Sequence, residues 1–184
     1  MVEVSDFSGS IRDYNGTGRW TAKAIIHSYR DYSQKFGRKS FRNLVPRTHT
    51  EGDVTWVYPV MEEVINGAED GDPACIAICI DFIEEDQSFP FGAILKSNSA
   101  RALRRARLSD EQMERVRARI VGMLLTGYVP REFKEYAKLL RRVGVETWWP
   151  ILERRIPREN PHAMRYYNYL RSHLREPSKP KAAG

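Results

Sequence analysis

The sequence predicts an all-α single domain of about six to eight helices, packed as antiparallel pairs in a bundle or a short α-solenoid. Two observations support this prediction. Apolar residues recur at helical spacing in successive segments, and glycine or proline stands where those segments would end or begin. In addition, no Asn-Gly dipeptide separates two alternating runs, so we expect no β-hairpin.

The length of 184 residues fits one domain with short ends. Residues 1–18 are poor in apolar periodicity and rich in Gly, Ser and Asn, and they are expected to form an N-terminal arm or loop. The helical domain is expected over 19–175. Residues 176–184 are expected to be a disordered tail.

The first helix is expected over 19–36, where Ile25, Tyr29 and Tyr32 lie at helical spacing and Gly37 follows as a stop. The next segment, 54–66, is ambiguous. Its first five residues, 54–58, alternate as in a strand, but the following proline suits the first turn of a helix. We favour a helix that ends before residue 67, and the strand remains the alternative for 54–58.

The most apolar segment, 73–86, begins with Pro73 after Asp72, a favourable N-cap residue. Its isoleucines would equally suit a buried strand, so 74–83 also stays open between the two structures. A length of about fourteen residues exceeds that of an ordinary strand. We therefore expect a central buried helix.

The second half of the chain contains clearer helix signals. Residues 87–98 are expected to be a break that closes one end of the core, and a short helix follows over about 99–107. Ser109 and Gln112 form a capping box for a helix that ends near residue 126. Further helices are expected from Pro130 to the residue before Gly144, as a short helix or turn at 146–156, and over about 161–174.

The charges are divided into blocks along the chain. The segment 51–86 holds eleven acidic residues and no Lys or Arg, whereas 96–175 holds nineteen basic residues against eight acidic ones. Opposite blocks attract each other within or between chains. We expect an acidic patch at one end of the molecule and an exposed basic face away from it, with self-association possible at low salt.

The basic residues of the second half fall on helix faces, because they recur at intervals of three and four. Such faces suit an anion, since Lys and Arg neutralise phosphates, but they are also what a solvated surface shows. The candidate nucleic-acid-binding residues are Arg101, Arg104, Arg105, Arg115, Arg119, Lys134, Lys138, Arg141 and Arg142. On the last helix, tyrosines beside arginines could stack on bases, although half of them fit a core-facing stripe.

The sequence offers little for catalysis or metal binding, and we expect no metal and no cofactor. Cys75 and Cys79 lie four apart in an apolar setting and are expected to be buried reduced thiols, which suits a cytoplasmic protein. The four histidines are scattered. His27 and Asp31 could form a base and its partner, but an exposed hydrogen bond explains them better.

Three hypotheses for function follow. The leading one is a non-enzymatic helical domain that binds another macromolecule, expected to be a protein, through segregated acidic and basic surfaces. The second is nucleic-acid binding through the basic helix faces of 101–142. The third is an enzyme, although no group of residues in the sequence indicates a catalytic site. We expect no membrane partner, because no apolar stretch approaches the length of a span.

Overall fold

The computed structural model describes residues 9–174, and 61% of them are helical, so the prediction of a mostly helical protein is confirmed. The helices are α1 (Ala22–Lys35), α2 (Met61–Glu69), α3 (Pro73–Glu85), α4 (Gly92–Arg105), α5 (Asp110–Leu125), α6 (Phe133–Val143), α7 (Trp149–Arg155) and α8 (Pro161–Arg171), with 3-10 helices η1 (Gly18–Trp20) and η2 (Glu146–Trp148). A small sheet of β1 (Ser10–Asp13), β2 (Thr48–Glu51) and β3 (Val54–Val57) makes the fold not purely α. The tail expected at 176–184 lies outside the described residues.

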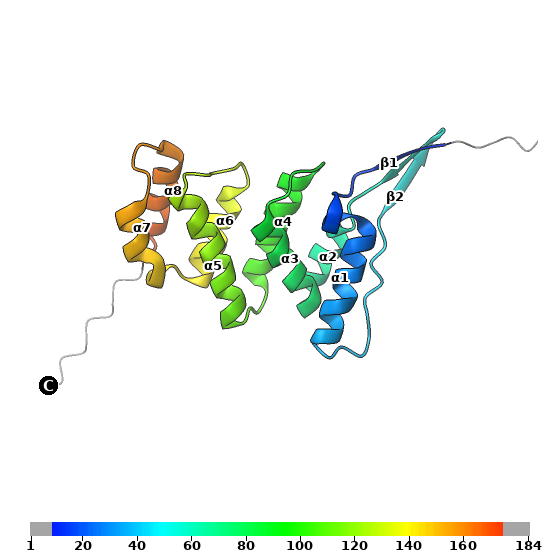
Figure 1. Ribbon diagram of the computed structural model, residues 1–184, viewed down its shortest axis with the longest axis horizontal. Helices are drawn as coiled ribbons and strands as arrows, with labels where there is room; N and C mark the ends of the chain where they lie inside the picture. Colours follow the sequence, from blue (N-terminus) through cyan, green and yellow to red (C-terminus); the bar gives the residue numbers. More distant parts are fainter. Residues whose placement is uncertain (1–8, 175–184) are drawn as a thin grey trace, which may run out of the picture.

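The helices stack along one long axis in two layers (Figure 1). Helices α1, α3, α5 and α7 follow one another in the first layer, and α2, α4, α6 and α8 follow one another in the second. Helices of one layer pack on the next helix of the same layer, and the layers are joined mainly where α3 packs on α2 and α4 and where α5 packs on α6 and α8. This is a solenoid-like arrangement, and it leaves each layer with an outer face toward solvent.

Helix α3 lies at the centre of the stack. Every residue from Ala74 to Ile83 is buried. The Asp72 carboxylate accepts a hydrogen bond from the backbone N–H of Ala74 at 3.0 Å, and Pro73 occupies the first turn. The preference for a central buried helix at 74–83 is thus confirmed, and the strand alternative is excluded.

The sheet contradicts three predictions. Residues 54–57 form a strand rather than a helix, and part of the expected N-terminal arm, Ser10–Asp13, pairs in parallel with it. Strands β2 and β3 form a hairpin through the two-residue turn Gly52–Asp53, where Gly52 has φ of 56°. The expectation of no β-hairpin is therefore wrong: Gly-Asp is itself a hairpin signal, and the lack of Asn-Gly between alternating runs does not exclude a hairpin.

Two helix boundaries also differ from the predictions. Helix α2 continues through Gly67, because this glycine permits close packing on Cys75 rather than ending the helix; a Cβ added there would lie 3.2 Å from the Cβ of Cys75. Helix α4 begins at Gly92, so most of the break expected at 87–98 is helical. Its buried Lys96 masks the helical pattern, since a lysine inside the core is expected only where carboxylates pair with it.

The remaining helices follow their sequence signals. Both hydrogen bonds of the capping box between Ser109 and Gln112 are present at the start of α5. Asn160 caps α8, and Gly144 follows α6 with φ of 85°. Helix α6 starts at Phe133, three residues later than expected from Pro130, and the short helix or turn expected at 146–156 is η2 followed by α7.

Candidate anion-binding site

The candidate basic residues of α5, Arg115 and Arg119, form salt bridges with carboxylates at the acidic end of α3. The Nη2 atom of Arg115 lies 2.8 Å from Oδ1 of Asp81, and its Nε lies 3.0 Å from Oε1 of Glu84. Arg19 joins the same cluster, with 3.0 Å between its Nη2 and Oδ2 of Asp81. Burial and the hydrogen bond to Asp81 raise the pKa of Tyr32 to about 12.

A second cluster lies deeper, where α3, α4 and α6 meet. The Lys96 ammonium pairs with Asp86 and lies 3.1 Å from Oε1 of Glu132, and all three side chains are largely buried. Burial alone would lower the pKa of Lys96, but its hydrogen bonds to the two carboxylates prevail and raise it. Arg119 adds a contact of 3.3 Å to Asp86.

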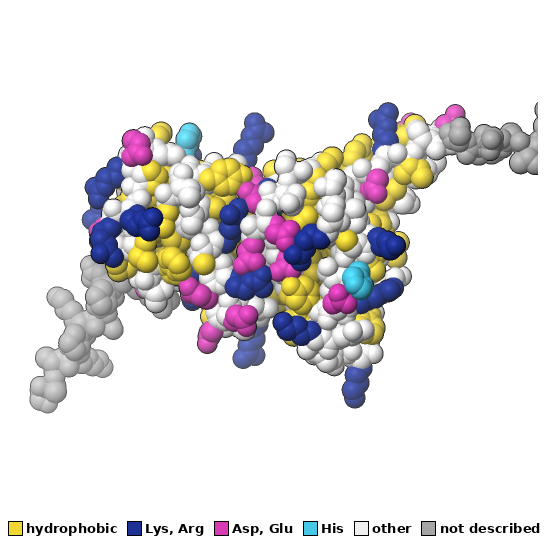
Figure 2. All heavy atoms as spheres, viewed as in Figure 1, with side chains coloured by type: hydrophobic (Ala, Val, Ile, Leu, Met, Phe, Trp, Pro, Cys, Tyr) yellow, Lys and Arg dark blue, Asp and Glu magenta, His cyan; other side chains and the backbone are white. Residues whose placement is uncertain are grey.

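These ion pairs contradict the acidic patch that the sequence predicts at one end of the molecule. The acidic end of α3 is not an exposed patch, because its four carboxylates are bound by cations of η1, α4 and α5. Figure 2 shows acidic and basic side chains interleaved at the middle of the molecule. The acidic and basic blocks of the sequence thus meet within one chain, and of the nine candidate residues Arg115 and Arg119 are neutralised here.

In the second layer, one carboxylate binds several cations: that of Glu135 at the start of α6. It accepts hydrogen bonds from Arg104 at 3.1 Å and from Lys138 at 3.0 Å, and Arg101 lies 3.6 Å away. Burial opposes ionisation, but these cations prevail and lower the pKa of Glu135. Three candidate cations thus share one carboxylate. Arg105 pairs separately with Glu69 at 3.0 Å.

The last three candidates, Lys134, Arg141 and Arg142, make no salt bridge to any residue between 9 and 174. All three are exposed on α6. The Arg141 guanidinium carbon lies 5.7 Å from the centre of the Tyr169 ring, a cation–π contact that leaves its N–H groups available. Among the nine candidates, these three cations of α6 are therefore the least neutralised.

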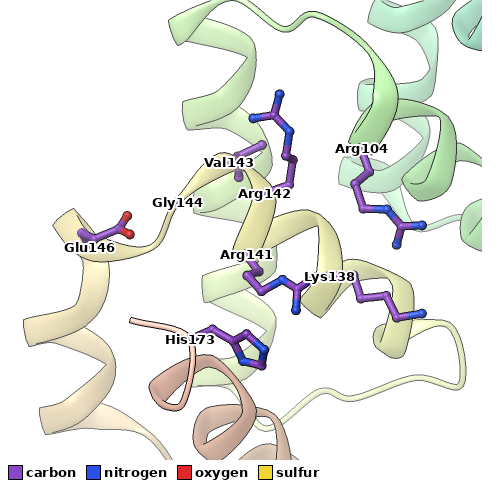
Figure 3. A pocket seen from close by; sticks show the side chains of 8 residues that line it. All are labelled: Arg104, Lys138, Arg141, Arg142, Val143, Gly144, Glu146 and His173. Carbon is purple, nitrogen blue, oxygen red and sulfur yellow. The ribbon is translucent and has the colours of Figure 1, made fainter. Parts of the chain in front are cut away.

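The structure brings four of the candidates together around a hollow of about 600 Å³ (Figure 3). Arg104 reaches from α4 toward α6, and Lys138 and Arg141 extend into the same space. Arg142, His173 and the turn at Gly144 and Glu146 complete the lining. The four cations outnumber the two nearby carboxylates, Glu135 and Glu146, so the lining of the hollow carries a net positive charge.

Sequence periodicity missed a supporting residue, Arg117. Its guanidinium donates to the carbonyl oxygen of Val143 at 2.6 Å from Nη2 and to that of Gly144 at 3.0 Å from Nε. The two carbonyls stand at the end of α6, where helix carbonyls lack partners. Arg117 thereby fixes the wall of the hollow. Only proximity in space shows this role, since 26 positions separate Arg117 from Val143.

The residues considered for catalysis or metal binding lie outside the hollow. Cys75 and Cys79 are free and buried, and burial raises the pKa of both thiols, that of Cys79 to about 12. His27 and Asp31 form an exposed pair with 3.4 Å between Nε2 and Oδ2. Within residues 9–174, no group of three or more His, Cys, Asp or Glu side chains could hold a metal ion.

None of the helices between residues 9 and 174 has both the length and the apolar character needed to cross a membrane. Comparison with known proteins adds no family: no family model matches the chain, and neither a curated protein nor a solved structure matches it.

Proposed function

We propose that this chain is a non-enzymatic helical domain that binds an acidic segment of a partner protein in the basic hollow between α4, α6 and His173. The observation that carries the proposal is a contrast among the candidate cations, six of which are paired with carboxylates. Carboxylates neutralise the cations on the α3–α5 side, whereas Arg141 and Arg142 line the hollow with no salt bridge to residues 9–174. The buried thiols with raised pKa values favour binding over nucleophilic catalysis, and they suit a cytoplasmic protein.

The number of available cations favours a protein partner over a nucleic acid. A protein that contacts six to ten phosphates needs roughly that many Lys or Arg side chains in register with the backbone. Six of the nine candidates are already engaged with carboxylates. A short acidic segment needs only two or three cations and a recess, and the hollow supplies both.

Nucleic acid is the second candidate, and one observation favours it. Arg141 lies over the ring of Tyr169, which is half-buried, and an arginine beside an accessible aromatic ring is a stacking platform for bases of a single strand. Tyr167, in contrast, stacks on Trp149 at 4.9 Å and is buried, so it is part of the core.

A binding experiment separates the two partners. Fluorescence anisotropy at about 50 mM salt would compare a labelled ten-residue peptide of alternating Glu and Gly with a labelled single strand of DNA of about 20 nucleotides. We expect the peptide to bind wild type, and the double variant Arg141→Ala/Arg142→Ala to lose at least about tenfold in affinity.

The matched control is Arg155→Ala, which removes an exposed arginine of α7 that lines none of the hollows described for residues 9–174. We expect this variant to bind the peptide as wild type does. No peptide binding at about 50 mM salt, or an equal loss in the control, refutes the proposal. DNA binding with a log-log salt slope that indicates several phosphate contacts would instead support the second candidate.

A further inference from the structure

A second hollow adjoins the basic one and differs from it in chemistry. It has a volume of about 200 Å³, and its apolar lining comes from the end of α4, the start of α5 and the end of α6: Leu103, Ala106, Leu108, Met113 and Val143. Val143 and Arg142 line both hollows, so the two lie next to each other at the end of α6. We call this second hollow the apolar notch.

The notch exists because α4 ends where it does. Ala106 leaves the helix in an extended conformation, with φ of −68° and ψ of 156°, and its small side chain leaves room in front of Leu103. On the other side, Arg117 holds the carbonyl of Val143 and so fixes the end of α6. Both walls are therefore in place before any ligand binds, which lowers the entropic cost of binding.

The rim of the notch is positive. Arg107 and Arg142 line it, both are exposed, and neither makes a salt bridge with any residue from 9 to 174. A neutral apolar ligand would gain nothing from these guanidinium groups. A segment that places one aliphatic side chain between carboxylates would use the notch, its rim and the basic hollow together.

We infer that the notch and the basic hollow form one groove, which selects acidic segments that carry an aliphatic side chain beside their carboxylates. This inference rests on the proposed function and adds the feature that determines specificity. A volume of about 200 Å³ is several times the roughly 30 Å³ that one water occupies in the liquid, so it admits an aliphatic side chain. A second copy of this chain cannot offer the acidic end of α3 to the groove, because those carboxylates are already paired.

Two peptides of equal length and charge test the inference. The first alternates Glu and Gly over ten residues, and the second has Leu in place of one central Gly. We expect the Leu peptide to bind wild-type protein about tenfold more tightly at about 150 mM salt, because the notch removes its side chain from water. Equal affinities overturn the inference but leave the proposed function standing, whereas failure of both peptides to bind at low salt refutes the proposed function as well.

The protein-side test fills the notch. Ala106→Leu should abolish the preference for the Leu peptide over the Glu-Gly peptide, because its larger side chain occupies the notch. The matched control is Ala118→Leu, an exposed position on α5 that lines neither hollow, and it should keep the preference. Retention of the tenfold preference in a folded Ala106→Leu variant overturns the inference. If that variant does not fold by far-UV circular dichroism, the two-peptide comparison on wild type decides.

Discussion

Arg115 of α5 reaches Asp81 of α3 across the first helix layer, with 2.8 Å between Nη2 and Oδ1, although the two residues lie 34 positions apart in sequence. Asp81 also accepts hydrogen bonds from Arg19 and from the hydroxyl of Tyr32. One buried carboxylate therefore joins η1, α1 and α5 to the central helix. Its loss leaves three donors without their acceptor, and that cost determines the first prediction.

Asp81→Asn should lower the free energy of unfolding by about 2 kcal/mol. The figure is below the roughly 3–5 kcal/mol typical when a fully buried pair is broken, because Arg19 and Arg115 are partly exposed and water can reach them. Urea unfolding measures the change. Asp31→Asn is the control: its carboxylate pairs with His27 on the surface, and its loss should cost less than about 0.5 kcal/mol.

Tyr32 should make stability depend on alkaline pH. Its pKa is raised to about 12 in the folded protein, so between about pH 10 and 12 the unfolded chain loses this proton while the folded chain keeps it. Stability from this group is present below pH 10 and is lost as the pH rises toward 12. Tyr32→Phe should reduce the fall in unfolding free energy over that range, and an identical pH profile in the variant would refute the assignment.

Glu135→Gln should have opposite effects on binding and on stability. Removal of the carboxylate frees Arg104 and Lys138 to face the basic hollow, so the affinity for the Glu-Gly peptide should rise about threefold or more at pH 7. The same change should destabilise the fold by about 1–2 kcal/mol through lost charged hydrogen bonds. Glu153→Gln, on the exposed side of α7, should change neither quantity. Weaker peptide binding in Glu135→Gln would count against the hollow as the binding site.

A pair of glycine substitutions tests the packing of α2 on α3. Gly67→Ala and Gly122→Ala both replace a glycine inside a helix, which by itself favours the helix by about 0.5–1 kcal/mol. At Gly122 an added Cβ meets nothing within 4 Å, so this variant should be more stable. At Gly67 the added carbon overlaps the sulfur of Cys75, and the variant should lose about 1–3 kcal/mol. Thermal unfolding of the two variants should shift in opposite directions.

Salt should not alter the state of association, because most of the acidic block, including its four carboxylates at the end of α3, is paired within the chain. Sedimentation velocity at about 50 mM and about 500 mM salt should give one species of unchanged size. This expectation replaces the self-association at low salt that the charge blocks alone suggest. Oligomers that dissociate at high salt would show that unpaired charges still attract copies of the chain to each other.

The parts of the fold that could be predicted are those set by local chemistry. Asp72 before Pro73, Ser109 with Gln112, and the apolar stripe of α6 each specify a helix through contacts within a few residues. The strand at 54–57 has local signals as well, its alternating residues and the Gly52–Asp53 turn, but the proline that follows also suited a helix. Its pairing with Ser10–Asp13, more than forty positions earlier, could not be predicted, because no local pattern carries that information.

The candidate site, too, could be predicted only in part from the sequence. Periodicity correctly placed Lys138, Arg141 and Arg142 outside the core, because the face of a helix follows from spacing alone. It could not show that Glu135 binds Arg104 and Lys138, or that Arg115 finds Asp81, because those partners depend on which helices become neighbours. Tertiary pairing is what separates the neutralised arginines from the available ones.

The layered stack has a consequence for how the groove responds to local unfolding. Because each helix packs only on its near neighbours along the chain, the terminal helices can open without the centre, as in repeat proteins. His173 follows α8 at the outer end of the stack, whereas Arg104 belongs to the interior. Fraying of the last helix would therefore remove one wall of the hollow and leave the other intact. A ligand that bridges both would clamp the end of the chain to its middle, so that occupancy would slow hydrogen exchange in α8 first.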